Sequence, residues 1–155
     1  MFDDLRDLYQ EVILDHGRKP RNFRRLEDAT RTARGDNPLC GDRIELFIKL
    51  GEGDRIDDAA FQGRGCAIST ASASLMTETV RGKTPAEAEA LAVQFRDLAM
   101  TGTCPHCAAS LEDEMERLAP LSGVHEFPSR VKCATLAWHT LHAALAGSTE
   151  ASSES

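Results

Sequence analysis

Hydrophobic residues near the N-terminus recur at the spacing of one helix face. The stripe consists of Leu5, Leu8, Tyr9, Val12 and Ile13. Asp3 or Asp4 can cap this helix at its start, and Gly17 followed by Pro20 ends it. Because positions three and four residues apart lie on the same side of a helix, the stripe predicts an amphipathic helix that packs against the rest of the domain.

A different pattern follows, in which apolar and polar residues alternate. Every second residue over 43–50 is apolar, which predicts a strand with one buried face. After a glycine-rich turn, residues 56–62 return as the second strand of an antiparallel hairpin. Residues 29–35 are expected to form a short edge strand. The hairpin therefore brings the turn over residues 36–42 and the segment that starts at Gly63 to the same end of the sheet.

The second half of the chain carries mostly helical patterns, and 155 residues suffice for one domain with its own core. Helices are expected from Cys66 to about Gly82, from Thr84 to Gly102, from Ser110 to Leu118 and from Ser129 to Gly147, with a loop from Pro120 to Pro128. Thr84 and Glu87 have the spacing of a capping box. Residues 148–155 have almost no apolar content, so we expect a domain over 1–147 and a disordered C-terminal tail.

Composition limits the classes of protein to which the chain can belong. A formal net charge of −7 at pH 7 argues against nucleic acid as a partner, because nucleic-acid binders need a basic face. No signal sequence and no membrane-spanning apolar run is visible, so we expect a cytoplasmic protein with protein partners and no membrane contact. Five cysteines, an odd number, favour reduced thiols over a disulfide framework.

Three of the cysteines are expected at positions that suit metal chemistry. Cys66 starts a helix after two nearby glycines, where unpaired N–H groups and the helix macrodipole favour a thiolate. Cys133 is expected in the first turn of the last helix, and Cys40 lies in a turn two residues before Asp42. Three sulfurs and one carboxylate suit tetrahedral zinc. The three cysteines are far apart in sequence, however, and buried thiols without a ligand are common, so both interpretations remain open on these grounds.

Other polar groups also allow more than one interpretation. A basic stretch in this acidic chain is either a docking patch for an acidic partner or an ordinary solvated face; it contains Arg18, Lys19, Arg21, Arg24 and Arg25. His16, in the last turn of the first helix, is expected to interact with the helix dipole and unpaired carbonyls. Cys104, His106 and Cys107 are a redox dithiol, half of a second zinc site or a loop. Because two thiols and one histidine do not complete a tetrahedral site, a loop is favoured.

Four motifs stand in a fixed order along the chain. They are Leu8–His16 with Pro20–Asn22, Asn37–Asp42, Gly65–Ser69 with Ala71–Ser74, and Arg130–Trp138. Together they resemble SufU, the zinc-binding sulfur-transfer branch of the iron–sulfur scaffold family that also contains IscU and the N-terminal domain of NifU. The resemblance runs from about residue 5 to residue 146.

The resemblance implies an α+β fold, with a small, mostly antiparallel sheet of about three strands, helices on one face and a metal site at one end. It also implies Zn²⁺ held by Cys40, Asp42, Cys66 and Cys133. In this branch, which belongs to the SUF system, the partner is a pyridoxal-phosphate cysteine desulfurase that carries a persulfide. The motif position that accepts this sulfur is Cys40, and the sulfur goes on to iron–sulfur assembly proteins. Pyridoxal phosphate belongs to the desulfurase, not to this chain.

Two details favour the SufU branch over the scaffold branch. Lys132 stands where IscU-type proteins have a histidine before the third cysteine, and the segment Gly102–Phe127 resembles a stretch that IscU lacks. The alternative is a non-enzymatic scaffold on which the same ligands hold an iron–sulfur cluster, and a third interpretation is zinc that only stabilises the fold. Docking to the desulfurase is assigned to Arg18, Lys19, Arg21 and Arg130, although Arg130 also fits an exposed helix start.

Overall fold

The computed structural model describes residues 2–38, 41–102, 111–147 and 150–152. Helices in these segments are α1 (Phe2–Arg18), α2 (Ala67–Val80), α3 (Pro85–Thr101), α4 (Glu112–Leu118) and α5 (Pro128–Leu145), with 3-10 helices η1 (Glu52–Asp54) and η3 (Ala119–Glu126). The strands are β1 (Arg31–Asn37), β2 (Asp42–Leu50), β3 (Ile56–Arg64) and β4 (Glu150–Ser152). Cys40 and the Cys104, His106 and Cys107 motif lie outside the described residues.

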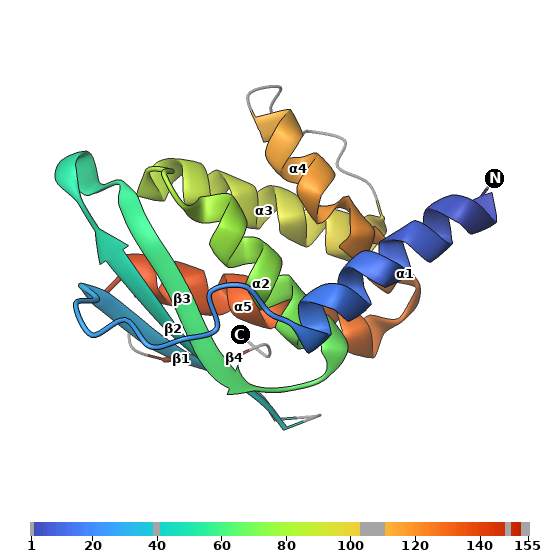
Figure 1. Cartoon of the computed structure of the whole chain (residues 1–155), viewed down its shortest axis with the longest axis horizontal. Helices are drawn as coiled ribbons and strands as arrows, with labels where there is room; N and C mark the ends of the chain where they lie inside the picture. Colours follow the sequence, from blue (N-terminus) through green and yellow to red (C-terminus); the bar gives the residue numbers. More distant parts are fainter. Residues whose placement is uncertain (1, 39–40, 103–110, 148–149, 153–155) are drawn as a thin grey trace.

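The strands form one sheet in the order β3-β2-β1-β4, and the helices lie on one face of it (Figure 1). β2 pairs antiparallel with both β1 and β3. The predicted α+β fold with a small, mostly antiparallel sheet is confirmed; its antiparallel part is the predicted three strands β1, β2 and β3. The register pairs Asn37 with Asp42 and Arg43 with Arg64, so the start of β2 and the end of β3 meet at one end of the sheet, as the hairpin pattern predicts.

The buried face of the sheet packs mainly against α5 and α2. Ile44, Leu46 and Ile48 alternate along β2 and join the main hydrophobic cluster. Gly35 in β1 lies so close to α5 that an added Cβ would overlap the Thr140 hydroxyl, and glycine therefore allows strand and helix to approach. Part of the opposite face is covered by Leu26, from the segment between α1 and β1, which packs on Phe47.

α2 is the central helix, and its small residues allow neighbours to approach on several sides. Ten of its residues are buried, among them Ala71, Ser72 and Ala73. At its first residue, a Cβ added to Gly17 of α1 would lie 3.3 Å from the Cβ of Ala67. The Ser72 hydroxyl donates to the α5 carbonyl of Ala134 over 2.5 Å. The start of α2 is therefore fixed between α1, α5 and the end of β3.

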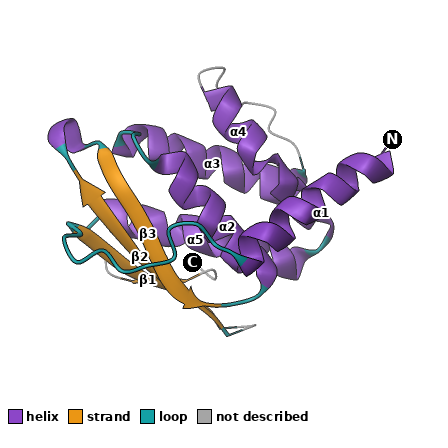
Figure 2. Cartoon of the chain, viewed as in Figure 1, coloured by secondary structure: helices purple, strands orange, loops and turns teal. Residues whose placement is uncertain are grey.

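An outer layer of α3, α4 and η3 covers the side of α2 and α5 away from the sheet (Figure 2). The predicted capping box at the start of α3 is present, with reciprocal bonds between Thr84 and Glu87. Phe95 of α3 stacks on Trp138 of α5 with ring centroids 5.0 Å apart. The prediction of a loop from Pro120 to Pro128 is wrong, because η3 forms there and buries Pro120, Leu121 and Val124 in the core.

The C-terminal tail differs from its sequence-based expectation at one point. Residues 150–152, part of the segment expected to be disordered, form β4 and pair parallel with Arg34–Asp36 of β1. Because β1 would otherwise present an unpaired edge, even a short polar strand can hydrogen-bond to it. None of the described helices combines the length and apolar character that a bilayer crossing requires.

Candidate metal centre

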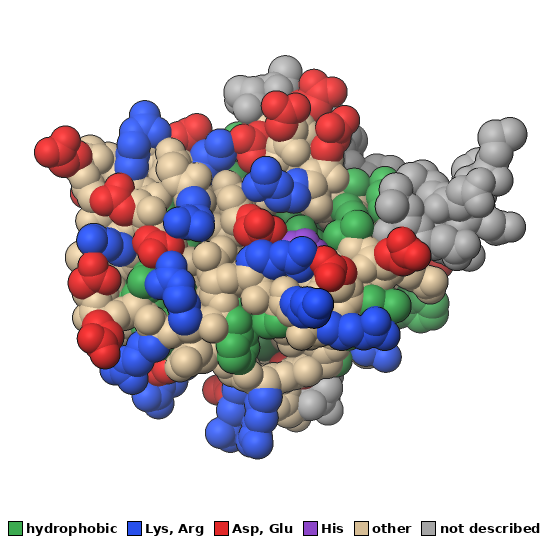
Figure 3. Space-filling view, in the orientation of Figure 1, with side chains coloured by type: hydrophobic (Ala, Val, Ile, Leu, Met, Phe, Trp, Pro, Cys, Tyr) green, Lys and Arg blue, Asp and Glu red, His purple; other side chains and the backbone are tan. Residues whose placement is uncertain are grey.

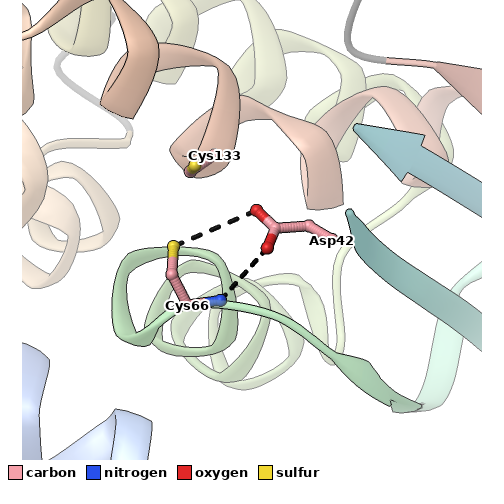
Figure 4. A group of neighbouring side chains, drawn as sticks. All are labelled: Asp42, Cys66 and Cys133. Atoms are coloured by element: carbon pink, nitrogen blue, oxygen red, sulfur yellow. Dashed lines mark hydrogen bonds between the residues drawn. The ribbon is translucent and has the colours of Figure 1, made fainter. Parts of the chain in front are cut away.

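Asp42, Cys66 and Cys133 meet at the end of the sheet where β2 begins (Figure 4). One ligand atom from each residue lies within 4.8 Å of the others. Asp42 is the first residue of β2, Cys66 is the residue before α2, and Cys133 belongs to α5. Three segments far apart in the sequence thus place two sulfurs and a carboxylate around one point.

Cys66 is held by hydrogen bonds at the start of α2. Its sulfur caps the helix by accepting the Ser69 N–H over 3.4 Å. Asp42 reaches the same residue with both oxygens: Oδ1 accepts the Cys66 N–H at 3.1 Å, and Oδ2 lies 3.9 Å from the Cys66 sulfur. The N-terminal N–H groups and the positive end of the helix dipole therefore face both acidic groups.

Gly65 allows Asp42 to approach the start of α2. A Cβ at this position would lie 2.9 Å from Asp42 Oδ1 and 3.0 Å from the Ser69 hydroxyl. Two residues earlier, Gly63 has a φ of +148° and its missing side chain faces the Arg43 carbonyl of β2. The two glycines noted in the sequence before Cys66 therefore have a steric reason, because each lets another segment approach closely.

Cys133 is positioned differently from the prediction. The helix begins at Pro128, so Cys133 is the sixth residue of α5 and does not lie in its first turn. The sulfur is instead held by burial, with 4% of the residue exposed, and by the Asn37 side chain, whose Nδ2 lies 3.8 Å from it. Sequence reasoning treated Asn37 only as part of a turn, although its place in the Asn37–Asp42 motif was a signal.

The chemistry of the three groups fits a divalent cation. Asp42 is 2% exposed, and burial of a carboxylate beside two thiols is unfavourable unless hydrogen bonds or a cation compensate. Two sulfurs and one carboxylate oxygen are also a donor set that zinc accepts, and a tetrahedral site would take one more ligand. The predicted fourth ligand, Cys40, lies outside the described residues, two positions before Asp42 in sequence.

The predicted partner-binding residues lie at the end of α1, in the segment that follows it and at the start of α5. Arg18 and Lys19, at the end of α1, are exposed and follow Gly17, which contacts α2 next to Cys66. Arg130 is exposed in the first turn of α5. Arg21 is partly buried and pairs with Asp15 at 2.6 Å, where its guanidinium holds the pKa of that carboxyl below the usual value.

The basic stretch does not form an unbroken positive surface. Arg24 pairs with Asp58 at 2.7 Å, and the Arg25 guanidinium lies over the Phe47 ring. On the face shown in Figure 3, basic and acidic side chains are interspersed. Among the described residues, Arg18 and Lys19 have no ion-pair partner, so they are the part of the stretch available to another protein.

Comparison with known proteins matches this architecture to one family. The model of the NifU-like N-terminal domain matches residues 8–134. The chain belongs to this family. A similar solved structure is FiSufU from Fervidobacterium islandicum AW-1, described as an iron–sulfur cluster assembly scaffold protein for the SUF system. It has a TM-score of 0.77 and 33% identity, with 87% of this chain and 94% of that chain covered.

Two curated relatives have similar identity but different names. The zinc-dependent sulfurtransferase SufU of Bacillus subtilis is 43% identical, with 92% of each chain covered. The iron–sulfur cluster assembly scaffold protein IscU of Streptococcus pyogenes is 42% identical, with 95% of this chain and 88% of the relative covered. The comparisons therefore establish an iron–sulfur cluster assembly family and confirm the resemblance to SufU and IscU proteins.

Proposed function

We propose that this protein transfers sulfur for iron–sulfur cluster assembly as a zinc-bound partner of a cysteine desulfurase. The observation that carries the proposal is the convergence of Asp42, Cys66 and Cys133 within 4.8 Å. The 43% identity to a relative named zinc-dependent sulfurtransferase supports it. We assign Zn²⁺ to these three residues and Cys40, and a cytoplasmic location to the protein.

Cys40 is the proposed acceptor of the sulfur. Its thiolate attacks the terminal sulfur of the persulfide on the desulfurase, the S–S bond of that persulfide breaks, and the desulfurase cysteine leaves as a thiolate. A new S–S bond forms on Cys40, so the step needs no external oxidant or reductant. Bound zinc would supply a deprotonated, protected thiolate at neutral pH. Cys66 and Cys133 are less suited to leave the centre, because α2 and α5 hold them.

Arg18, Lys19 and Arg130 are proposed to face an acidic surface of the desulfurase, with Arg21 in a supporting position. Exposed charges of this kind mainly increase the rate of encounter, and salt weakens their effect. Substitution of both Arg18 and Lys19 by glutamate should therefore increase the concentration of this protein that half-maximal stimulation of the desulfurase requires. The increase should be largest at low salt. The proposed onward acceptors are iron–sulfur assembly proteins.

The decisive experiment is a cysteine desulfurase assay with and without the protein, paired with mass spectrometry of its peptides. We expect stimulated turnover and one additional sulfur atom on the Cys40 peptide. Cys40→Ala should fold but fail to stimulate, whereas the matched variant Cys104→Ala should stimulate normally. A persulfide on Cys104 or Cys107 would instead assign the transfer to that motif.

A scaffold function is the second candidate, because the Streptococcus pyogenes relative is named as a scaffold. In that case the same residues would hold iron in a cluster that is built and passed on. Metal analysis of purified protein separates the two candidates. Colourless protein with one tightly held zinc favours sulfur transfer, and brown protein with cluster absorbance after anaerobic purification favours the scaffold.

A further inference from the structure

We infer that Asn37 is a positioning residue of the metal centre, whose side-chain amide directs the Cys133 sulfur toward Asp42 and Cys66. The inference rests on the proposed function to the extent that it treats these groups as metal ligands. It assigns a role to a side chain that is not itself a ligand.

The contact joins two distant parts of the chain inside the protein. Asn37 is 1% exposed and Cys133 is 4% exposed, and the Nδ2 atom lies 3.8 Å from the sulfur, within reach of a hydrogen bond to this large atom. Asn37 is the last residue of β1, and Cys133 lies 96 positions later on α5. The amide donates, and the sulfur accepts.

The backbone of Asn37 fixes the origin of this side chain. Asn37 pairs with Asp42 in the β1–β2 register, and its carbonyl accepts the Gly41 N–H over 2.9 Å. The preceding part of β1 is packed against α5 at Gly35. One residue thus connects the strand that begins with the Asp42 carboxylate to the helix that carries Cys133.

An amide at this position has a chemical reason that packing alone does not give. Burial of an amide is unfavourable unless its groups are hydrogen-bonded, so an apolar side chain of similar size would be the simpler way to fill space. A neutral N–H donor orients a thiolate ligand and withdraws electron density from it without adding charge. Such partners of metal ligands typically change metal affinity by about 10–100-fold when removed.

The test compares metal binding by Asn37→Leu with that of the unchanged protein. Apo-protein is titrated with Co²⁺ while the thiolate-to-cobalt charge-transfer band is recorded, and zinc affinity is measured by competition with a chromophoric chelator. We expect zinc affinity to fall by about 10–100-fold. The charge-transfer band should move to longer wavelength, because a thiolate without its donor releases electrons more easily. The matched control Gln94→Leu replaces another buried amide, on α3, which supplies no residue to the cluster.

Circular dichroism of the apo-proteins checks that each variant folds. If Asn37→Leu does not fold, Asn37→Asp carries the test, because it keeps the shape but lacks the donor, and the band should move in the same direction. Unchanged affinity and band position would overturn the inference. These readouts use no desulfurase, so a protein that meets both expectations but does not stimulate a desulfurase would retain the positioning role and lose the transfer function. Failure of the unchanged protein to bind zinc or cobalt would overturn both.

Discussion

Cys66 and Cys133 lie on neighbouring helices, but different parts of those helices hold them. Cys66 is half-buried at the start of α2, where its sulfur accepts a backbone N–H and faces the helix dipole. Cys133 lies one turn inside α5, buried, with the Asn37 amide as a side-chain partner. Polar backbone groups therefore stabilise one sulfur, whereas core packing and a side-chain amide hold the other.

This difference indicates what each position tolerates. The start of a helix accepts small polar residues, and serine is among the best of them. A buried position in the second turn of a helix, next to core residues such as Ala134 and Ala137, accepts a polar atom only when that atom finds partners. Substitution of either cysteine should therefore have the same effect on zinc content. The effects on the stability of the metal-free protein should differ between the two positions.

The largest expected effect is the loss of zinc from Cys66→Ser and Cys133→Ser. Both variants should lack stoichiometric zinc, because the ligands act on one ion. Without metal, Cys133→Ser should lose about 1–3 kcal/mol of unfolding free energy. Cys66→Ser should change by about 0.5 kcal/mol or less, because serine caps a helix well. Elemental analysis and urea unfolding in the presence of a chelator measure the two effects.

Equal destabilisation of the two metal-free serine variants would contradict the distinction between a helix cap and a core position. Full zinc occupancy in either variant would remove that residue from the ligand set. Ser72→Ala is the control for a general loosening of the contact between α2 and α5. It removes the hydrogen bond from the Ser72 hydroxyl on α2 to the Ala134 carbonyl on α5, but it removes no sulfur.

Gly65→Ala sharpens the comparison on the Cys66 side. The new Cβ would lie 2.9 Å from Asp42 Oδ1, so the carboxylate must move away from the start of α2. We expect metal-free stability to fall by about 1–3 kcal/mol, as for other overpacked sites. Zinc affinity should fall as well, by roughly tenfold or more, in the range of disturbed ligand orientation.

Gly123→Ala is the matched control for the glycine variant. Its Cβ would meet nothing within 4 Å, so the exchange should leave zinc affinity unchanged. Stability should stay constant or increase slightly, because alanine restricts the unfolded chain. If Gly65→Ala behaves like this control, the close approach of Asp42 is not needed for binding.

The elements of the fold could be predicted where local sequence patterns decide them. The alternation over β2, the capping box at Thr84 and the stripe of α1 are local, and each predicted element is present. The strand β4 has no such pattern, because it exists only where a free sheet edge accepts it. η3 was not predicted, because Pro120 indicated a loop. Proline is in fact tolerated in the first turn of a helix, where Pro120 lies.

The convergence of Asp42, Cys66 and Cys133 could be expected from the sequence, but the contacts that hold each of them could not. Asp42 and Cys66 follow from the hairpin, since strand pairing brings their ends together. The first turn of the last helix was placed at Ser129, and Cys133 was assigned to it, but a five-residue lead from Pro128 puts the thiol in the core. Asn37 could not be found from spacing, because its partner lies 96 residues away and becomes a neighbour only after folding.

A smaller effect is expected from His16, which packs α1 against α2. Its Nδ1 lies 2.7 Å from the Ser74 hydroxyl, which also accepts the Arg21 N–H. On the other side of the ring, Nε2 lies 3.9 Å from a Glu78 carboxylate oxygen. Burial, followed by the nearby Arg21 charge, lowers the pKa of His16 below 6.5. The expected contact with the helix carbonyls is thus replaced by a bond to α2.

A lowered histidine pKa means that the unfolded chain binds a proton more readily than the folded protein. His16 should therefore contribute no pH dependence well above pH 6.5 and destabilise the fold as the pH falls below that value. The slope for one proton is at most about 1.4 kcal/mol per pH unit. His16→Asn keeps a hydrogen-bonding side chain beside Ser74. Urea unfolding at several pH values should show that the unfolding free energy of this variant changes less between pH 7 and pH 5. Part of the pH dependence should remain, because burial also lowers the pKa of His139. The exposed His125→Asn is the control. If His16→Asn leaves the pH dependence of the unfolding free energy unchanged, His16 does not contribute to it.

The smallest effect is expected from deletion of residues 148–155. β4 adds a few hydrogen bonds to β1, each worth about 0.5–1.5 kcal/mol net. Ordering of a tail costs about 1–2 kcal/mol per residue, so the two contributions nearly cancel. The shortened chain 1–147 should unfold within a few degrees of the full protein and keep its zinc affinity within about twofold, as expected for a strand outside the cluster. Thermal unfolding measures the change in stability, and chelator competition measures the change in zinc affinity.

Because β4 pairs with Arg34–Asp36, directly before Asn37, a tenfold loss of zinc affinity would mean that the tail holds β1 in place for Cys133. The domain would then extend through residue 152, and the contrast between the two cysteines would include the C-terminal strand on the Cys133 side.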